Sequence, residues 1–66
     1  MARHFEASRS DAEYRSLLQV LIAADGVCAD PVLRQELVET GFVRRDQTDL
    51  LRLHLTPEGR RFVAGG

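Results

Sequence analysis

The chain of 66 residues is long enough for one small domain and too short for a second, and its 44% hydrophobic residues are enough for one core. A formal net charge of -1 excludes the strong basic excess that is common in nucleic-acid-binding domains, and no stretch approaches the roughly 18 apolar residues of a membrane span. The single cysteine cannot form an internal disulfide, and the N-terminal segment MARHFEASRS lacks the apolar middle of a signal peptide, so we expect a cytoplasmic protein that contacts no membrane.

Residues 1–9 show no sustained hydrophobic period and are expected to form a loose arm before a single domain over residues 10–64. Ser10 is predicted to open the first helix, because Ser10 and Glu13 have the spacing of a capping box. Apolar residues then recur at the spacing of one helical face: Tyr14, Leu17, Leu18, Leu21 and Ile22, with Val20 and Ala24 widening the stripe. Gly26 is expected to stop this helix, since glycine readily takes the left-handed conformation of a helix end.

The second predicted helix has signals at both of its ends. Asp30 is a good N-cap, and Pro31 occupies the first helical position, where its missing N–H is not needed. Gly41 follows the last helical residue, and a Schellman ending would pack Phe42 back onto Leu37.

From Phe42 onward the period changes from helical to alternating. The pattern predicts a strand over residues 42–45, a polar turn over 46–49 and a second strand over 50–55. In the second strand one face is purely apolar and is assigned to the core; it consists of Leu51, Leu53 and Leu55. Thr56 and Pro57 then start a short last helix that returns Phe62 and Val63 to the core.

The segments LVETGFVRR and LTPEGRRF flank this predicted hairpin and together cover about half of the chain. They resemble the wing half of winged-helix regulators of the MarR-like and PadR-like kind. In those proteins a recognition helix ends at a glycine, an apolar residue opens the first wing strand, and the second wing strand ends in a Leu-Thr-x-x-Gly-Arg turn. The matching residues are Leu37, Gly41, Phe42, Val43, Leu55, Thr56, Glu58, Gly59 and Arg60. The resemblance implies a small bacterial protein that binds DNA and regulates transcription.

The chain departs from that family in the number of its helices. A complete winged helix has three helices before the wing, of which the second and third form the helix-turn-helix. Only Val27, Cys28 and Ala29 separate Gly26 from Asp30, which leaves no room for a helix. The expected fold class is therefore α+β, a small winged-helix-like domain of helix, helix, β-hairpin and helix, reduced by one helix.

The candidate DNA-binding residues lie on the second helix and on the hairpin. Arg34 and Gln35 are predicted on the exposed helix face, where Arg could read guanine and Gln adenine. The hairpin candidates for phosphate contacts are Arg44, Arg45 and Arg52. Glu36 and Glu39 flank the helix face and would repel phosphates, so a merely solvated helix face is an equally open interpretation. Residues 42–66 are net basic while residues 1–41 are net acidic, which favours contacts through the wing.

A protein partner is the alternative to double-stranded DNA. Phe5, Val38 and Leu50 are apolar residues predicted to remain outside the core, and such residues can form a partner surface or the contact of a homodimer. Under this hypothesis the chain is an interaction adaptor, a phage- or plasmid-type modulator that has lost DNA binding.

The sequence predicts no catalytic residues, no metal ligands and no cofactor. His4, His54 and Cys28 lack the close spacing of a zinc site. Cys28 lies between apolar neighbours and is expected to be a buried, inert thiol. We therefore expect a binding protein and not an enzyme.

Overall fold

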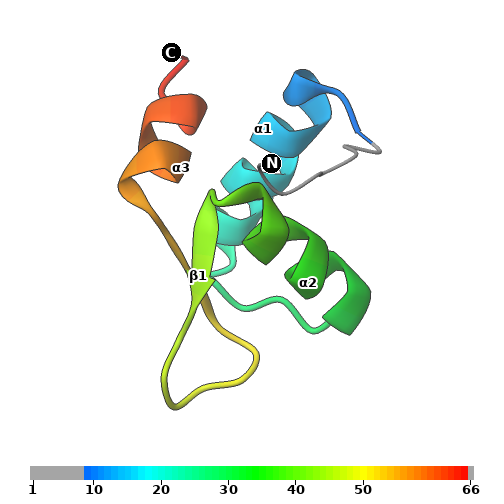
Figure 1. Ribbon diagram of the computed structural model, residues 1–66, viewed down its shortest axis with the longest axis vertical. Helices are drawn as coiled ribbons and strands as arrows, with labels where there is room; N and C mark the ends of the chain where they lie inside the picture. The colour runs from blue at the N-terminus through cyan, green and yellow to red at the C-terminus, as the bar shows by residue number, and fades with distance from the viewer. Residues whose placement is uncertain (1–8, 66) are drawn as a thin grey trace, which may run out of the picture.

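The computed structural model describes residues 9–65. Within that range the elements follow one another as helix, helix, β-hairpin and helix, which confirms the predicted α+β, winged-helix-like fold class (Figure 1). They are α1 (Asp11–Ala23), α2 (Pro31–Thr40), β1 (Val43–Arg45), β2 (Leu53–Leu55) and α3 (Pro57–Val63). Apart from Arg9, the predicted arm lies outside the described residues.

The first two helices begin where the local sequence predicted. The Ser10 hydroxyl accepts a hydrogen bond from the backbone N–H of Glu13 at 3.2 Å, and the Glu13 carboxylate accepts one from the N–H of Ser10 at 2.9 Å. At the start of α2 the Asp30 carboxylate accepts the N–H of Val32 at 2.9 Å, with Pro31 in the first helical position. Both caps satisfy N–H groups that have no partner inside the helix.

The end of α1 brings the chain close to the hairpin. Asp25 and Gly26 both have positive φ values, and the N–H of Gly26 donates to the carbonyl of Leu21 at 2.8 Å. A Cβ atom on Gly26 would collide with the carbonyl oxygen of Leu53 in β2. Glycine is therefore needed here for the turn and for the close approach of two backbones.

The last helix is tied to the first strand by backbone contacts. Thr56 caps α3 by accepting the N–H of Gly59 at 3.1 Å, and its hydroxyl donates to the carbonyl of Gly41 at 2.7 Å. A Cβ atom on Gly59 would collide with the carbonyl oxygen of Phe42, so this glycine lets α3 approach the residue before β1 closely. The ring of Phe42, which we expected on Leu37, stacks on the ring of Phe62 with centroids 4.3 Å apart.

The hairpin is antiparallel and shorter than predicted. Val43 pairs with Leu55, Arg44 with His54, and Arg45 with Leu53. Because side chains alternate along a strand, Arg45 shares the core-facing side with Val43, while Arg44 lies on the opposite, outer side.

The prediction that Leu51 belongs to the core is wrong. Leu53 is buried and Leu55 is half-buried against the core, but Leu51 lies before β2 and remains 44% exposed. The reason is a turn in which the N–H of Leu51 donates to the Asp49 carboxylate and the N–H of Arg52 donates to the Asp49 carbonyl. The turn interrupts the alternation that the sequence pattern assumed.

A third segment pairs with β2 on its other side. Val27 forms a single antiparallel bridge with Arg52, and the N–H of Leu53 donates to the carbonyl of Gly26 at 2.7 Å. The linker between α1 and α2 thus adds a short edge to the hairpin. A single bridge needs no alternating hydrophobic pattern, so this pairing could not be predicted from the sequence.

The buried core draws on both long helices, the linker and the hairpin. Its residues are Tyr14, Leu18, Leu21, Cys28, Leu37, Val43 and Leu53. Val38, expected to face outward, is half-buried and packs against this core. Val20, Ile22 and Ala24, expected on the inward stripe of α1, are exposed. Only a narrow stripe of α1 is covered, because no helix lies between α1 and α2 in the chain to pack on its remaining side.

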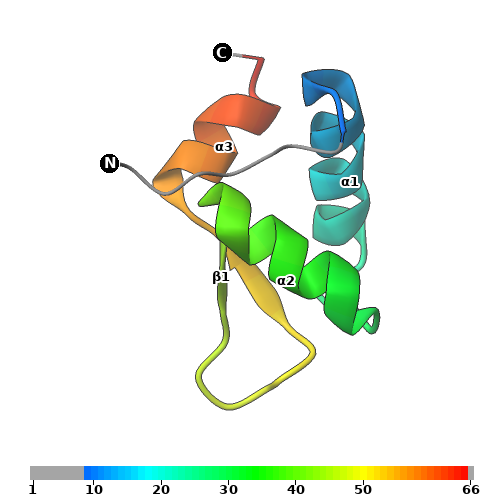
Figure 2. The same cartoon turned by 45° about the vertical axis from the view of Figure 1, so that its right-hand side comes forward.

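The hairpin loop and α3 lie at opposite ends of the domain. In Figures 1 and 2 the loop is at one end of the longest axis and α3 is at the other. α3 packs against α1 and β2, and α2 packs against β1.

Candidate functional site

Two of the predicted DNA-binding residues meet between α2 and β1. The guanidinium of Arg45 donates a hydrogen bond to the side-chain oxygen of Gln35. The amide nitrogen of Gln35 in turn donates to the carboxylate of Glu39 at 2.9 Å. Helix and hairpin are therefore joined by a row of exposed polar side chains.

Arg44 and Arg52 lie on the other side of the hairpin. Arg44 is opposite His54 in the register, and Arg52 precedes His54 by two residues, so their side chains share the outer face. Arg44 is exposed and forms no ion pair with the part of the chain that the structure describes.

The charge of Arg52 is balanced within the domain. Its guanidinium donates to the Asp25 carboxylate at 3.0 Å and to the Asp25 carbonyl at 2.9 Å, and it lies 3.5 Å from the Asp49 carboxylate. The hydrogen bond and the charge of Asp25, with a further contribution from Asp49, raise the pKa of Arg52 above its usual value. Arg52 therefore links the end of α1 to the hairpin turn.

Arg34 also has a partner inside the domain. Its guanidinium donates to the backbone carbonyl of Cys28 at 2.7 Å, which directs the side chain toward the linker. The five predicted DNA-binding residues thus fall into three places: Gln35 and Arg45 together, Arg44 and Arg52 on the outer hairpin face, and Arg34 at the linker.

The hairpin loop is ordered by a carboxylate that sequence reasoning treated only as part of a polar turn. Asp46 accepts hydrogen bonds from the N–H of Thr48 at 2.9 Å and of Asp49 at 2.8 Å, and it lies 2.6 Å from the His54 ring nitrogen. The bond to His54, followed by the two backbone N–H groups, holds the pKa of Asp46 far below its ordinary value. An aspartate two residues before a threonine is the pattern of an Asx-turn, and this signal could have been recognised in the sequence.

A second polar cluster ties α1 to α2. The Glu36 carboxylate accepts a hydrogen bond from the Tyr14 hydroxyl at 2.7 Å and two from the Arg9 guanidinium at 3.1 and 3.2 Å. Glu36 was expected to repel phosphates from the outward face of α2, and its pairing with Arg9 now offsets that repulsion. No local pattern could have revealed this cluster, since its members are up to 27 residues apart.

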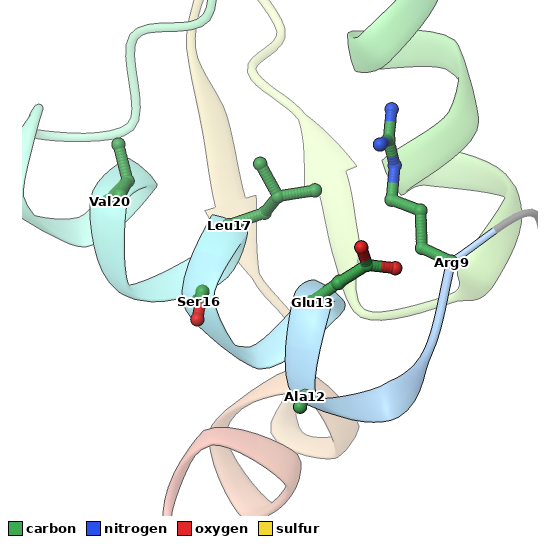
Figure 3. A pocket seen from close by; sticks show the side chains of 6 residues that line it. All are labelled: Arg9, Ala12, Glu13, Ser16, Leu17 and Val20. Atoms are coloured by element: carbon green, nitrogen blue, oxygen red, sulfur yellow. The ribbon is translucent and has the colours of Figure 1, made fainter.

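The predicted partner surface is only partly present. Leu50 is 76% exposed, as expected, whereas Val38 packs on the core and Phe5 lies outside the described residues. A shallow hollow also lies along α1, where Leu17 and Val20 project from the helix and the Arg9 side chain extends toward α2 (Figure 3). This hollow is mainly apolar.

The His, Cys, Asp and Glu side chains of residues 9–65 are dispersed over the domain. No group of three or more His, Cys, Asp or Glu side chains in this range is placed to hold a metal ion. Cys28 is a free, buried thiol whose sulfur lies 3.7 Å from the carbonyl of Asp30. No helix within the same residues has the length and apolarity to cross a membrane.

Comparison of the chain with protein-family models, curated proteins and solved structures gives no match. The functional proposal for this chain therefore rests on the geometry of its described residues. Residues 9–65 form a small α+β domain with three helices and a β-hairpin in a winged-helix-like order.

Proposed function

We propose that this chain is a small winged-helix-like module that binds double-stranded DNA, as a transcriptional regulator or an accessory protein of the MarR-like and PadR-like type. The observation that carries the proposal is the hydrogen bond between Gln35 of α2 and Arg45 of β1. It makes the exposed face of the helix and the base of the wing one polar surface. A recognition helix reads base edges in the major groove, and a polar surface that continues from the helix to the hairpin lets both contact the same duplex.

Different residues take different roles in this proposal. Gln35 and Arg45 are exposed, and in this proposal they exchange their mutual hydrogen bond, and Gln35 its bond to Glu39, for a base edge and a phosphate. Arg44 is exposed on the other side of the hairpin and contacts a second phosphate. Arg34 and Arg52 stabilise the domain in this proposal, because their half-buried side chains are bound to the linker and to Asp25.

The test is fluorescence anisotropy with random-sequence duplex DNA at several salt concentrations. Two phosphate contacts predict that the logarithm of the binding constant falls with the logarithm of the salt concentration with a slope of about -2. Arg44→Ala and Arg45→Ala should each lower the affinity and reduce this slope by about 1. Arg60→Ala is the matched control, since it removes the same charge from α3. Undetectable binding at low salt, or equal effects of all three changes, would contradict the proposal.

A protein-interaction adaptor without DNA binding is the second candidate. It is favoured by the internal engagement of Arg34 and Arg52, which leaves few guanidinium groups for phosphates. The exposed Val20 and Leu50 offer apolar contacts instead. The same titration separates the two functions, because an adaptor of this kind would not bind the duplex at any salt concentration.

A further inference from the structure

The hairpin loop is held in one conformation by its own side chains. The Asp46 carboxylate accepts the N–H and hydroxyl of Thr48 and the N–H of Asp49, and His54 lies on its other oxygen. The Asp49 carboxylate accepts the N–H of Leu51. The backbone also closes the loop, since the N–H of Asp46 donates to the carbonyl of Arg52 at 3.0 Å.

This ordered loop presents two leucines to solvent. Leu50 is 76% exposed and Leu51 is 44% exposed, beside the carboxylates of Asp46 and Asp49. A contact surface that is already ordered loses little conformational entropy on binding. The loop tip is therefore a pre-organised apolar contact beside the Asp46 carboxylate, which lies on His54, and the Asp49 carboxylate, which shares Arg52 with Asp25. These carboxylates outnumber the one arginine that pairs with them, so the negative charge that is left disfavours nucleic acid or an anionic membrane as the partner of the tip.

A hollow of complementary character lies at the other end of the hairpin. It is lined by Thr40, Phe42, Glu58, Arg61 and Phe62. The ring of Phe42 stacks on the ring of Phe62, the Arg15 guanidinium also lies over the Phe62 ring at 4.7 Å from its centroid, and both phenylalanines are half-buried. The aromatic surface that faces the hollow is therefore the part of these two rings that the contacts leave open. Arg61 is exposed and forms no ion pair within residues 9–65, so it supplies positive charge at the edge, next to the single carboxylate of Glu58.

We propose that two copies of the chain associate by placing the Leu50 loop tip of one copy in the Phe42–Phe62 hollow of the other. The loop and α3 lie at opposite ends of the domain in both views (Figures 1 and 2). Two copies in antiparallel orientation therefore bring each tip to the other copy's hollow, as a two-fold axis requires. The charge of Arg61 complements Asp46 and Asp49 of the partner copy.

This inference does not depend on the proposed DNA function, since it uses neither Gln35 nor Arg45. A dimer would give two α2–hairpin surfaces in a fixed relation if DNA binding holds. If DNA binding fails, the dimer contact remains and is measured in the absence of DNA.

The first test is sedimentation velocity of the full chain over a wide concentration range. We expect a reversible monomer–dimer equilibrium, which Leu50→Asp should weaken by about 30-fold or more if Leu50 is a central contact. Leu50→Gln is a second variant without added charge. Gln47→Asp is the matched control because it adds the same charge to the same loop. Arg61→Glu should weaken the dimer by up to about fivefold, the range of an exposed ion pair.

The second test locates the contact. A tagged chain with Leu50→Cys is mixed with an untagged chain with Arg61→Cys under mild oxidation, and the mixed disulfide is measured by mass spectrometry. The control pair replaces Arg61→Cys with Gln19→Cys on the exposed side of α1. We expect the mixed disulfide to form much faster in the first pair. A chain that is monomeric at every concentration, a dimer that Leu50→Asp leaves intact, or equal crosslinking in both pairs would overturn the proposal.

Discussion

The Tyr14 hydroxyl donates a 2.7 Å hydrogen bond to the Glu36 carboxylate, which also accepts two bonds from Arg9. Tyr14→Phe keeps the ring in the core, where the residue is 3% exposed, and removes only this hydroxyl. Hydrogen bonds to charged groups typically contribute about 1.5–3 kcal/mol. Because Glu36 keeps Arg9 in the variant, we expect the free energy of unfolding to fall toward the lower part of that range, by about 2 kcal/mol.

This loss is a large share of the total for a chain of 66 residues, for which a stability of about 3–10 kcal/mol is typical. The midpoint of thermal unfolding should fall by about 8–16 °C. Urea denaturation followed by circular dichroism measures the change at constant temperature. The slope of the transition with urea should stay the same, because the surface exposed on unfolding does not change.

A double-mutant cycle with Glu36→Gln decides whether the two side chains act together. We expect a coupling energy of at least about 1 kcal/mol, since the residues are in direct contact. Glu39→Gln on the same helix is the matched control and should stay within about 0.5 kcal/mol of the unchanged chain. A loss below about 0.5 kcal/mol for Tyr14→Phe, or additive effects in the cycle, would refute the view that this bond ties α1 to α2.

Three further predictions follow from the loop, the glycine contact and the bridging arginine. Asp46 has a lowered pKa, so its stabilising effect should be present above its ordinary pKa of 3.8 and be lost as the pH falls toward the folded-state value. The free energies of unfolding of Asp46→Asn and of the unchanged chain, measured by unfolding titrations at several pH values, should therefore become equal in acid. Gly59→Ala should lower the free energy of unfolding by about 2 kcal/mol, because the new methyl group meets the Phe42 carbonyl; an unchanged melting temperature would contradict the close contact. Arg52→Ala should lower stability by up to about 1 kcal/mol, given the partly exposed pair with Asp25, while duplex affinity stays the same where the domain is folded; a loss of affinity there would assign it to DNA contact.

The candidate surfaces were predictable to different degrees. Leu50 was recognised as exposed because the alternating pattern placed it on the outer face of the predicted strand, although the structure places it in the loop before β2. The contact between Gln35 and Arg45 was not, although both residues were candidates, because it depends on how α2 packs against β1. The internal roles of Arg34 and Arg52 were missed, since a long side chain can reach partners in several directions and the sequence names none of them.

What the sequence by itself determined is the order of the elements and where the helices begin. Ser10, Asp30 and Thr56 each cap a helix through hydrogen bonds to residues two or three positions further on, so these signals act within one turn and need no tertiary contact.

Only the tertiary structure decided which apolar residues are covered and which charges are balanced. Val38 is packed and Ile22 is exposed because the coverage of a helix face depends on the elements beside it. Arg52 binds Asp25 across 27 positions of sequence, and Leu51 leaves the strand because the Asp49 turn competes with the β-ladder. Such outcomes depend on distances that exist only once the chain has folded.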